Sequence, residues 1–189
     1  MKKTDKRILS SISAINSSMI ELLEHKDISR ITVKEICEHA QINRSTFYAH
    51  YDNPMHVLVS IEKGLIDSIN SLLAEENIGD VRSFTVQPIE KILEYILENK
   101  RIVLVMLGDN ANQGFIRQLI DIVKRENFMN HNTGIPVHPD SEYIFEFLAT
   151  GAVSVVRKWL KEDETRDIHE VSEMIYTISI YGQSGYMPR

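Results

Sequence analysis

The sequence predicts an all-α fold, and three observations support this. Apolar residues recur every three or four positions along most of the 189-residue chain, which is the period of an amphipathic helix. The alternation of apolar and polar residues that marks a half-buried strand is not found. Helix-capping residues stand where one apolar stripe ends and the next begins. We expect a three-helix N-terminal head followed by a larger helical domain.

Three helices are expected in the head, within residues 1–55. Thr32, with Glu35 three residues later, forms a capping box that starts the second helix. Asn43 caps a short third helix whose inner anchor is Phe47. The buried stripe of the first helix is Ile8, Ile12, Ile15, Met19, Leu22 and Leu23, and that of the second is Val33, Ile36, Cys37 and Ala40.

The larger domain is expected over residues 56–189. Asn53-Pro54 restarts the chain with a cap and a proline at the first helical position. Residues 143–160 carry apolar side chains nearly all the way round, so that helix must be covered on every side. Helices are expected around 54–72, 89–97, 102–107, 115–123, 143–160 and 168–178, with a polar loop at 127–140.

The short third helix carries an unusually dense row of hydrogen-bonding and aromatic side chains between residues 43 and 51. The DNA major groove matches such a row in shape and chemistry. Capping or packing explains any one of these residues about as well as DNA contact does, but their joint placement favours DNA. The expected DNA-binding residues are Thr32, Lys34, Asn43, Arg44, Ser45, Thr46, Tyr48 and His50.

Charge and cysteine content agree with a protein of the cytoplasm that touches a polyanion at one end. Residues 1–56 hold eight basic and seven acidic residues, a net +1, while the remainder holds 13 and 20, a net −7. Ordinary scatter of surface charge explains this equally well. The single cysteine, Cys37, excludes an intrachain disulfide and is expected in the core. The N-terminal MKKTDKRILSS lacks the apolar core of a signal peptide, and no membrane span or membrane partner is expected.

Residues 6 to about 60 resemble the DNA-binding domain of the TetR family of bacterial transcriptional regulators. The resemblance rests on ITVKEICEHA, INRSTFYAHY and NPMHVL, and most of all on the Thr-Phe-Tyr-x-His-Tyr string. MLGDNANQGFIRQL at 106–119 and FLATGAVSVVRKWL at 147–160 resemble, more weakly, the ligand-binding and dimerisation region of Firmicutes-type members. The resemblance implies an all-helical homodimer with a helix-turn-helix head, 1–55, that binds a palindromic DNA operator. It also implies an effector-binding and dimerisation domain, 56–189, and repression relieved by a small-molecule effector.

Two positions depart from the family pattern. Gln41 occupies the turn position where the family often has glycine, and this requires a backbone conformation that glycine adopts more easily. Pro54 stands where a lysine commonly contacts phosphate. We therefore expect phosphate binding to depend more on Lys34, Thr46, Tyr48 and His50.

In the larger domain, the last two helices are expected to pair with the same two helices of a second copy. Burial within one chain is the alternative. The expected interface residues are Phe145, Leu148, Ala149, Ala152, Val156, Val171, Ile175 and Ile178. The expected effector-pocket residues are Ile69, Leu93, Leu97, Met106, Phe115, Leu119 and Phe147, although plain core packing is an alternative for each.

Other functional classes find less support. No phosphate-binding glycine loop, nucleophile elbow or zinc-type cluster is present, so we expect no enzyme, catalytic residue, cofactor or metal site. His131, His138, Asp140 and Glu142 could hold a metal, but solvated loop residues explain them better. A TetR-like activator that works with a protein partner, or a helical interaction module without an effector, is the alternative function. The operator sequence, the effector, the regulated genes and the direction of regulation are not encoded in these residues.

Overall fold

The computed structural model describes residues 3–75, 85–108, 114–129, 139–162 and 166–184. These residues form helices and contain no strand, which confirms the all-α prediction. In chain order the elements are α1 (Lys3–Leu23), the 3-10 helix η1 (Ile28–Arg30), α2 (Val33–His39), α3 (Arg44–Tyr48), α4 (Pro54–Glu75), α5 (Gln87–Glu98), α6 (Lys100–Met106), α7 (Gly114–Met129), α8 (Ser141–Lys161) and α9 (Ile168–Ser184).

The chain forms two compact units. The first comprises the described residues within Met1–Leu65 and Val105–Gln113, and the second those within Ile66–Leu104 and Gly114–Arg189. The chain therefore passes from one compact unit to the other inside α4 and again inside α6. The expected division of the chain into a DNA-binding head, 1–55, and an effector-binding and dimerisation domain, 56–189, stays a prediction.

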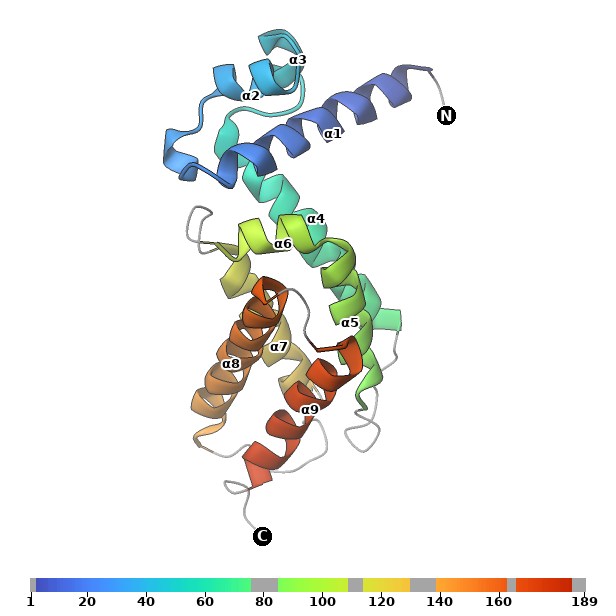
Figure 1. Ribbon diagram of the computed structural model, residues 1–189, viewed down its shortest axis with the longest axis vertical. Coiled ribbons are helices and arrows are strands. Elements are labelled where there is room, and N and C mark those ends of the chain that lie inside the picture. Colours follow the sequence, from blue (N-terminus) through green and yellow to red (C-terminus); the bar gives the residue numbers. More distant parts are fainter. Residues whose placement is uncertain (1–2, 76–84, 109–113, 130–138, 163–165, 185–189) are drawn as a thin grey trace. The chain divides into compact units, whose positions relative to one another are not determined.

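The first unit buries the inner faces of α1, α2 and α3, which pack against one another (Figure 1). Ile15 and Met19 of α1 and Phe47 of α3 are fully buried. The expected stripe on α1 is wrong at its first residue, because Ile8 is 41% exposed. Cys37 is buried as expected, and removal from water raises the pKa of its thiol.

The capping box of α2 is present in full. The Thr32 hydroxyl accepts from the amide of Glu35, and the Glu35 carboxylate accepts from the amide of Thr32 at 3.0 Å. The Lys26 ammonium also donates to Glu35. The hydrogen bond from Lys26, followed by those from the Thr32 hydroxyl and amide, lowers the pKa of Glu35 from 4.5 to about 2. The capping box thus depends on an ionised carboxylate.

Helix α4 begins as the sequence predicts. Asn53 accepts a hydrogen bond from the amide of His56 at 2.9 Å, so it caps a helix that starts with Pro54. The inward side of the helix is buried, with Val57 and Leu58 inaccessible to solvent.

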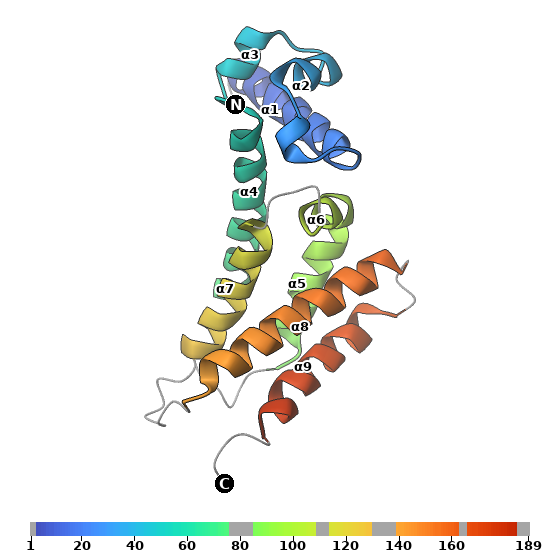
Figure 2. The same ribbon diagram turned by 90° about the vertical axis from the view of Figure 1, so that its left-hand side faces the viewer.

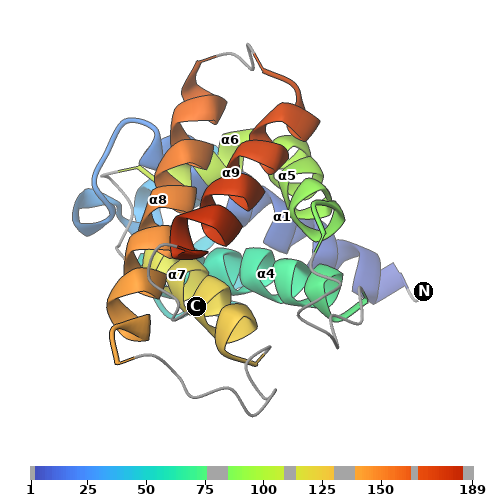
Figure 3. The same cartoon turned by 90° about the horizontal axis from the view of Figure 1, so that it is seen from below.

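In the second unit, α8 packs against α7 and α9, its neighbours in sequence, and α9 also packs against α5. Helix α9 lies between α5 and α8 (Figure 3), and α8 and α9 run side by side (Figure 2). Hydrogen bonds between described residues support this packing. The indole of Trp159 donates to the carbonyl of Arg166 at 2.9 Å, and His169 of α9 lies 2.6 Å from Glu90 of α5. The carboxylate of Glu90 raises the pKa of His169.

Helix α7 extends to Met129, three residues into the loop expected at 127–140; most of the rest of that loop lies outside the described residues. No helix in the described part of the chain is long and apolar enough to cross a membrane.

We predict that the capping box makes the head sensitive to acid. A carboxyl whose pKa is lowered in the folded state stabilises the fold above its unfolded value, near 4.5, and loses this effect as the pH falls towards about 2. The free energy of unfolding should therefore fall more steeply over this range in the wild type than in Glu35→Gln. Urea denaturation at several pH values measures the difference. Glu38→Gln, one turn along the same helix, is the control and should keep the wild-type slope. Equal slopes for the wild type and Glu35→Gln would refute the prediction.

Candidate nucleic-acid interface

The turn between α2 and α3 positions the reading helix, α3. Gln41 has a φ of +53°, the left-handed conformation that costs least at glycine. The turn closes when the amide of Ile42 donates to the carbonyl of Cys37 at 3.0 Å. Gln41 therefore adopts the backbone conformation that glycine would adopt at this position. This conformation costs free energy in a residue with a side chain.

Helix α3 is anchored from its inner side. Phe47 is fully buried, with its ring 6.1 Å from the ring of Tyr51. Tyr51 is also buried, and its hydroxyl donates to the side chain of Asn16 on α1 at 3.2 Å. These contacts fix the rotation of α3 about its own axis, because a different rotation would expose the Phe47 ring.

The opposite side of α3 is open to solvent. Arg44, Ser45 and Tyr48 are exposed, with Tyr48 57% accessible, while Thr46 and His50 are half-buried. The ring of Tyr48 stands edge-on to Phe47 at 5.5 Å, which holds an exposed aromatic side chain in one orientation. The structure thus brings the expected residues of α3 onto one short, supported surface.

Asn43 organises the start of this surface. Its Oδ1 accepts from the amide of Thr46 at 2.7 Å, from the hydroxyl of Ser45 at 2.7 Å and from the hydroxyl of Thr46 at 2.8 Å. The phosphate contact that the sequence suggests for the Thr46 hydroxyl would need this last bond to break.

The two expected residues at the start of α2 are also engaged within the chain. The hydroxyl of Thr32 donates to Glu35 at 2.8 Å. Lys34 is exposed, and its Nζ lies 3.7 Å from a carboxylate oxygen of Glu38. Sequence reasoning did not consider Glu38, although the four-residue spacing on one helix predicts this ion pair. Any phosphate bound by Lys34 must compete with that carboxylate.

The residues expected to line an effector pocket are divided between the two units. Met106 belongs to the first unit and the other six to the second. Ile69, Leu93, Met106 and Phe115 are buried, and Leu97 and Leu119 are half-buried. The placement of Phe147 in an interior pocket is corrected, because its side chain is 75% exposed on the outer side of α8.

The expected dimer interface needs a similar correction. Phe145, Leu148, Ala149, Val156 and Val171 are buried within one chain, Ala152 and Ile175 are half-buried, and Ile178 is 50% exposed. Five of the eight side chains therefore already pack inside a single copy. Among the described residues of α8 and α9, the most exposed apolar side chains are Tyr143 and Phe147 of α8, 79% and 75% exposed, and Tyr181 of α9, 68% exposed.

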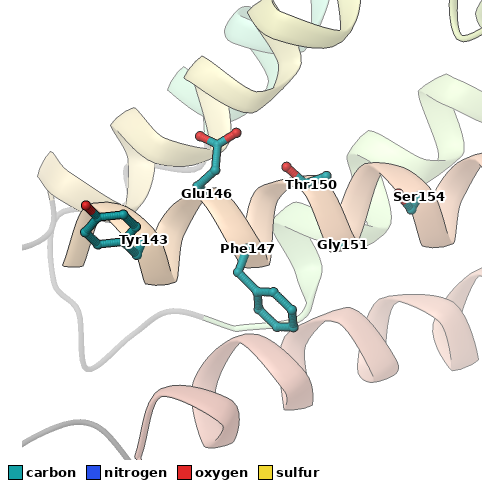
Figure 4. A pocket seen from close by; sticks show the side chains of 6 residues that line it. All are labelled: Tyr143, Glu146, Phe147, Thr150, Gly151 and Ser154. Atoms are coloured by element: carbon teal, nitrogen blue, oxygen red, sulfur yellow. The ribbon is translucent and has the colours of Figure 1, made fainter. Parts of the chain in front are cut away.

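An open groove of about 440 Å³ runs along this outer face of α8 (Figure 4). Its lining comes from successive turns of the one helix: Tyr143, Glu146, Phe147, Thr150, Gly151 and Ser154. Tyr143, Phe147 and Gly151 are spaced by four residues, so they lie along one side of the helix. We call these six residues the outer α8 face.

No group of three or more metal-binding side chains occurs among the described residues. His131 and His138, considered from sequence as ligands, lie outside them.

Comparison with known proteins decides the family. A family of the TetR type, described as "Transcriptional regulator C-terminal region", matches residues 86–181, slightly more than half of the chain. The chain belongs to the TetR family of transcriptional regulators. Transcriptional regulation is the role that this family description names.

Among curated proteins, this TetR-family chain is similar to the uncharacterized HTH-type transcriptional regulator YxbF of Bacillus subtilis, with 20% identity over 177 residues. That match covers 89% of this chain but 44% of YxbF, so the chain spans less than half the length of this relative.

Two solved structures share the fold. A TetR regulator from Streptococcus agalactiae superposes with a TM-score of 0.66 and 20% identity, covering 93% of this chain and 97% of that one. FadR from Bacillus subtilis, in complex with stearoyl-CoA, has a TM-score of 0.64 and 14% identity, covering 90% and 98%.

Substitution of Gln41 should report the backbone strain in the turn. Gln41→Gly should raise the free energy of unfolding by up to about 1 kcal/mol, since glycine adopts a positive φ without steric cost. Gln41→Val should lower it by about 1–2 kcal/mol, because a β-branched residue fits the left-handed region poorly. Urea denaturation gives both values. A valine variant as stable as the glycine variant would show that the turn can relax.

Proposed function

We propose that this regulator is a homodimeric repressor that binds a palindromic operator in the cytoplasm and is released by a small effector. The observation that carries the proposal is the exposed row Arg44, Ser45 and Tyr48 on a helix whose opposite side is locked by Phe47. A reading helix of this kind enters the major groove by its N-terminal part. Arg44, the first residue of α3, is placed to reach a guanine edge or a phosphate.

We further propose that two copies associate through the outer α8 face. Two aromatic side chains exposed on one side of α8, Tyr143 and Phe147, favour a protein partner over solvent. Gly151 is compatible with such a contact, because a Cβ added there would meet nothing within 4 Å among the described residues. Glycine in a helix interior lowers helix stability. The absence of a side chain at Gly151 lets a partner helix approach closely. An antiparallel twofold pairing would then place Phe147 of one copy near the small residues of the outer α8 face of the other.

For the effector, we propose an apolar or amphipathic molecule bound in the second unit. The buried or half-buried residues Ile69, Leu93, Leu97, Phe115 and Leu119 support this class, and the complex of FadR with stearoyl-CoA is consistent with it. An effector that shifts α4 would change the separation of two reading heads, which must match half-sites about 34–36 Å apart. Such a shift would weaken binding at both half-sites together.

The DNA-binding part is tested by truncating the reading face. Arg44→Ala and Tyr48→Ala should each weaken binding to a duplex selected by the wild type from a random-sequence pool by at least about tenfold. Lys158→Ala, which removes a charge from α8, is the control and should leave the affinity unchanged. Binding should also fall by roughly tenfold or more between about 50 and 200 mM salt, because phosphate contacts release counterions. Full retention by both variants would leave a helical interaction module as the better description.

The dimer part is tested by placing a charge on the outer α8 face. Phe147→Glu should convert the protein into single copies, since two carboxylates would be buried against an apolar surface. Leu9→Glu, at a residue that is 54% exposed on α1, should leave the oligomeric state unchanged. Light scattering after size-exclusion chromatography measures both. A wild type that is a single copy, or a Phe147→Glu variant that stays paired, would exclude this face as the interface.

A further inference from the structure

The cap of the reading helix determines which hydrogen bonds its side chains can still offer. A backbone amide can only donate, so the 2.7 Å contact between the amide of Thr46 and the side chain of Asn43 identifies the Asn43 atom as the oxygen. That oxygen can only accept. The hydroxyls of Ser45 and Thr46, at 2.7 and 2.8 Å from it, must therefore be the donors.

This geometry determines whether the Ser45 hydroxyl can donate or accept a further hydrogen bond. A serine hydroxyl has one hydrogen and two lone pairs. Because the hydrogen of Ser45 points at Asn43, the oxygen has only lone pairs left for a partner. Ser45 is exposed, whereas Thr46, which is bound in the same way, is half-buried. Ser45 is thus the better placed of the two to accept a hydrogen bond from outside the protein.

An acceptor at this position discriminates between the surfaces of DNA. Phosphate oxygens only accept, so the capped Ser45 hydroxyl cannot bind them. In the major groove the only base donors are the exocyclic amino groups of adenine, N6, and of cytosine, N4. Guanine and thymine present acceptors there, so they would face the oxygen of Ser45 with no hydrogen between them.

We propose that Ser45 is a specificity-determining residue that accepts a hydrogen bond from the exocyclic amino group of an adenine or a cytosine. This assignment rests on the proposed DNA-binding function. Ser45 then accepts a hydrogen bond from a base, whereas the neighbouring Arg44 can only donate hydrogen bonds. The two neighbouring side chains then read opposite hydrogen-bonding patterns on the base edges.

The experiment removes the amino group from the DNA and the hydroxyl from the protein. The wild type first selects a duplex from a random-sequence pool. Each adenine is then replaced in turn by purine, which lacks the N6 amino group, and each cytosine by 2-pyrimidinone, which lacks the N4 amino group. At one position in each half-site we expect the wild type to lose roughly three- to tenfold in affinity, the effect of one neutral hydrogen bond, and Ser45→Ala to lose less than about twofold. The replaced base at that position tells adenine from cytosine.

The matched control is Ser29→Ala. The hydroxyl of Ser29 donates to Asp27 at 2.6 Å in the same kind of cap, at η1, so this variant removes an equivalent bond outside the reading helix. It should show the full wild-type loss on the modified duplex. Thr46→Val tests the neighbouring hydroxyl. This variant should also show the wild-type loss of affinity on the modified duplex.

Four outcomes separate the possibilities. A wild type that is insensitive to every amino-group deletion overturns the assignment without needing any variant to fold. A loss that persists unchanged in Ser45→Ala, or that disappears in Thr46→Val, also overturns it while leaving sequence-specific binding intact. A wild type that retains no duplex from the pool contradicts the proposed function itself.

Discussion

The burial of Phe47 is the constraint on which the reading surface depends. Helix α3 is five residues long, far shorter than a helix that persists in water on its own. Its conformation must therefore come from packing, and the fully buried Phe47 ring supplies the contact. Because one side of so short a helix is fixed inward, Arg44, Ser45 and Tyr48 have no alternative to facing outward. A cavity at this position would loosen every side chain of the row at once.

Local hydrogen bonds then decide what the exposed side chains can do. Serine and threonine are usually described as able to donate or accept, and at the start of a helix they are grouped together as DNA ligands or as caps. Here the bonds to Asn43 and Glu35 leave Thr32, Ser45 and Thr46 as acceptors, while Arg44 remains a donor. The chemical character of the surface therefore follows from the caps as much as from the residue types.

The head was predictable because its signals are local. The capping box at Thr32, the cap at Asn43 and the anchor Phe47 each depend on residues within a few positions of one another. The outer side of α8 was not predictable from the sequence. A helix with apolar side chains all round has no periodicity that would identify its buried side. Tertiary packing made that choice and turned Phe145 inward and Phe147 outward, two residues apart. The hydroxyl directions at Ser45 and Thr46 needed coordinates, since sequence spacing does not say which atom donates.

The position of Cys37 has a practical consequence. It is the only cysteine of the chain, it is 6% exposed, and burial raises the pKa of its thiol. Alkylating reagents attack the thiolate of accessible cysteines, so the native side chain should react slowly. A cysteine engineered at a solvent-facing site away from the outer α8 face, such as Leu9 on α1, would then be the preferred point of attachment for a fluorophore or spin label. Distances between labelled copies could be followed without first removing the natural thiol.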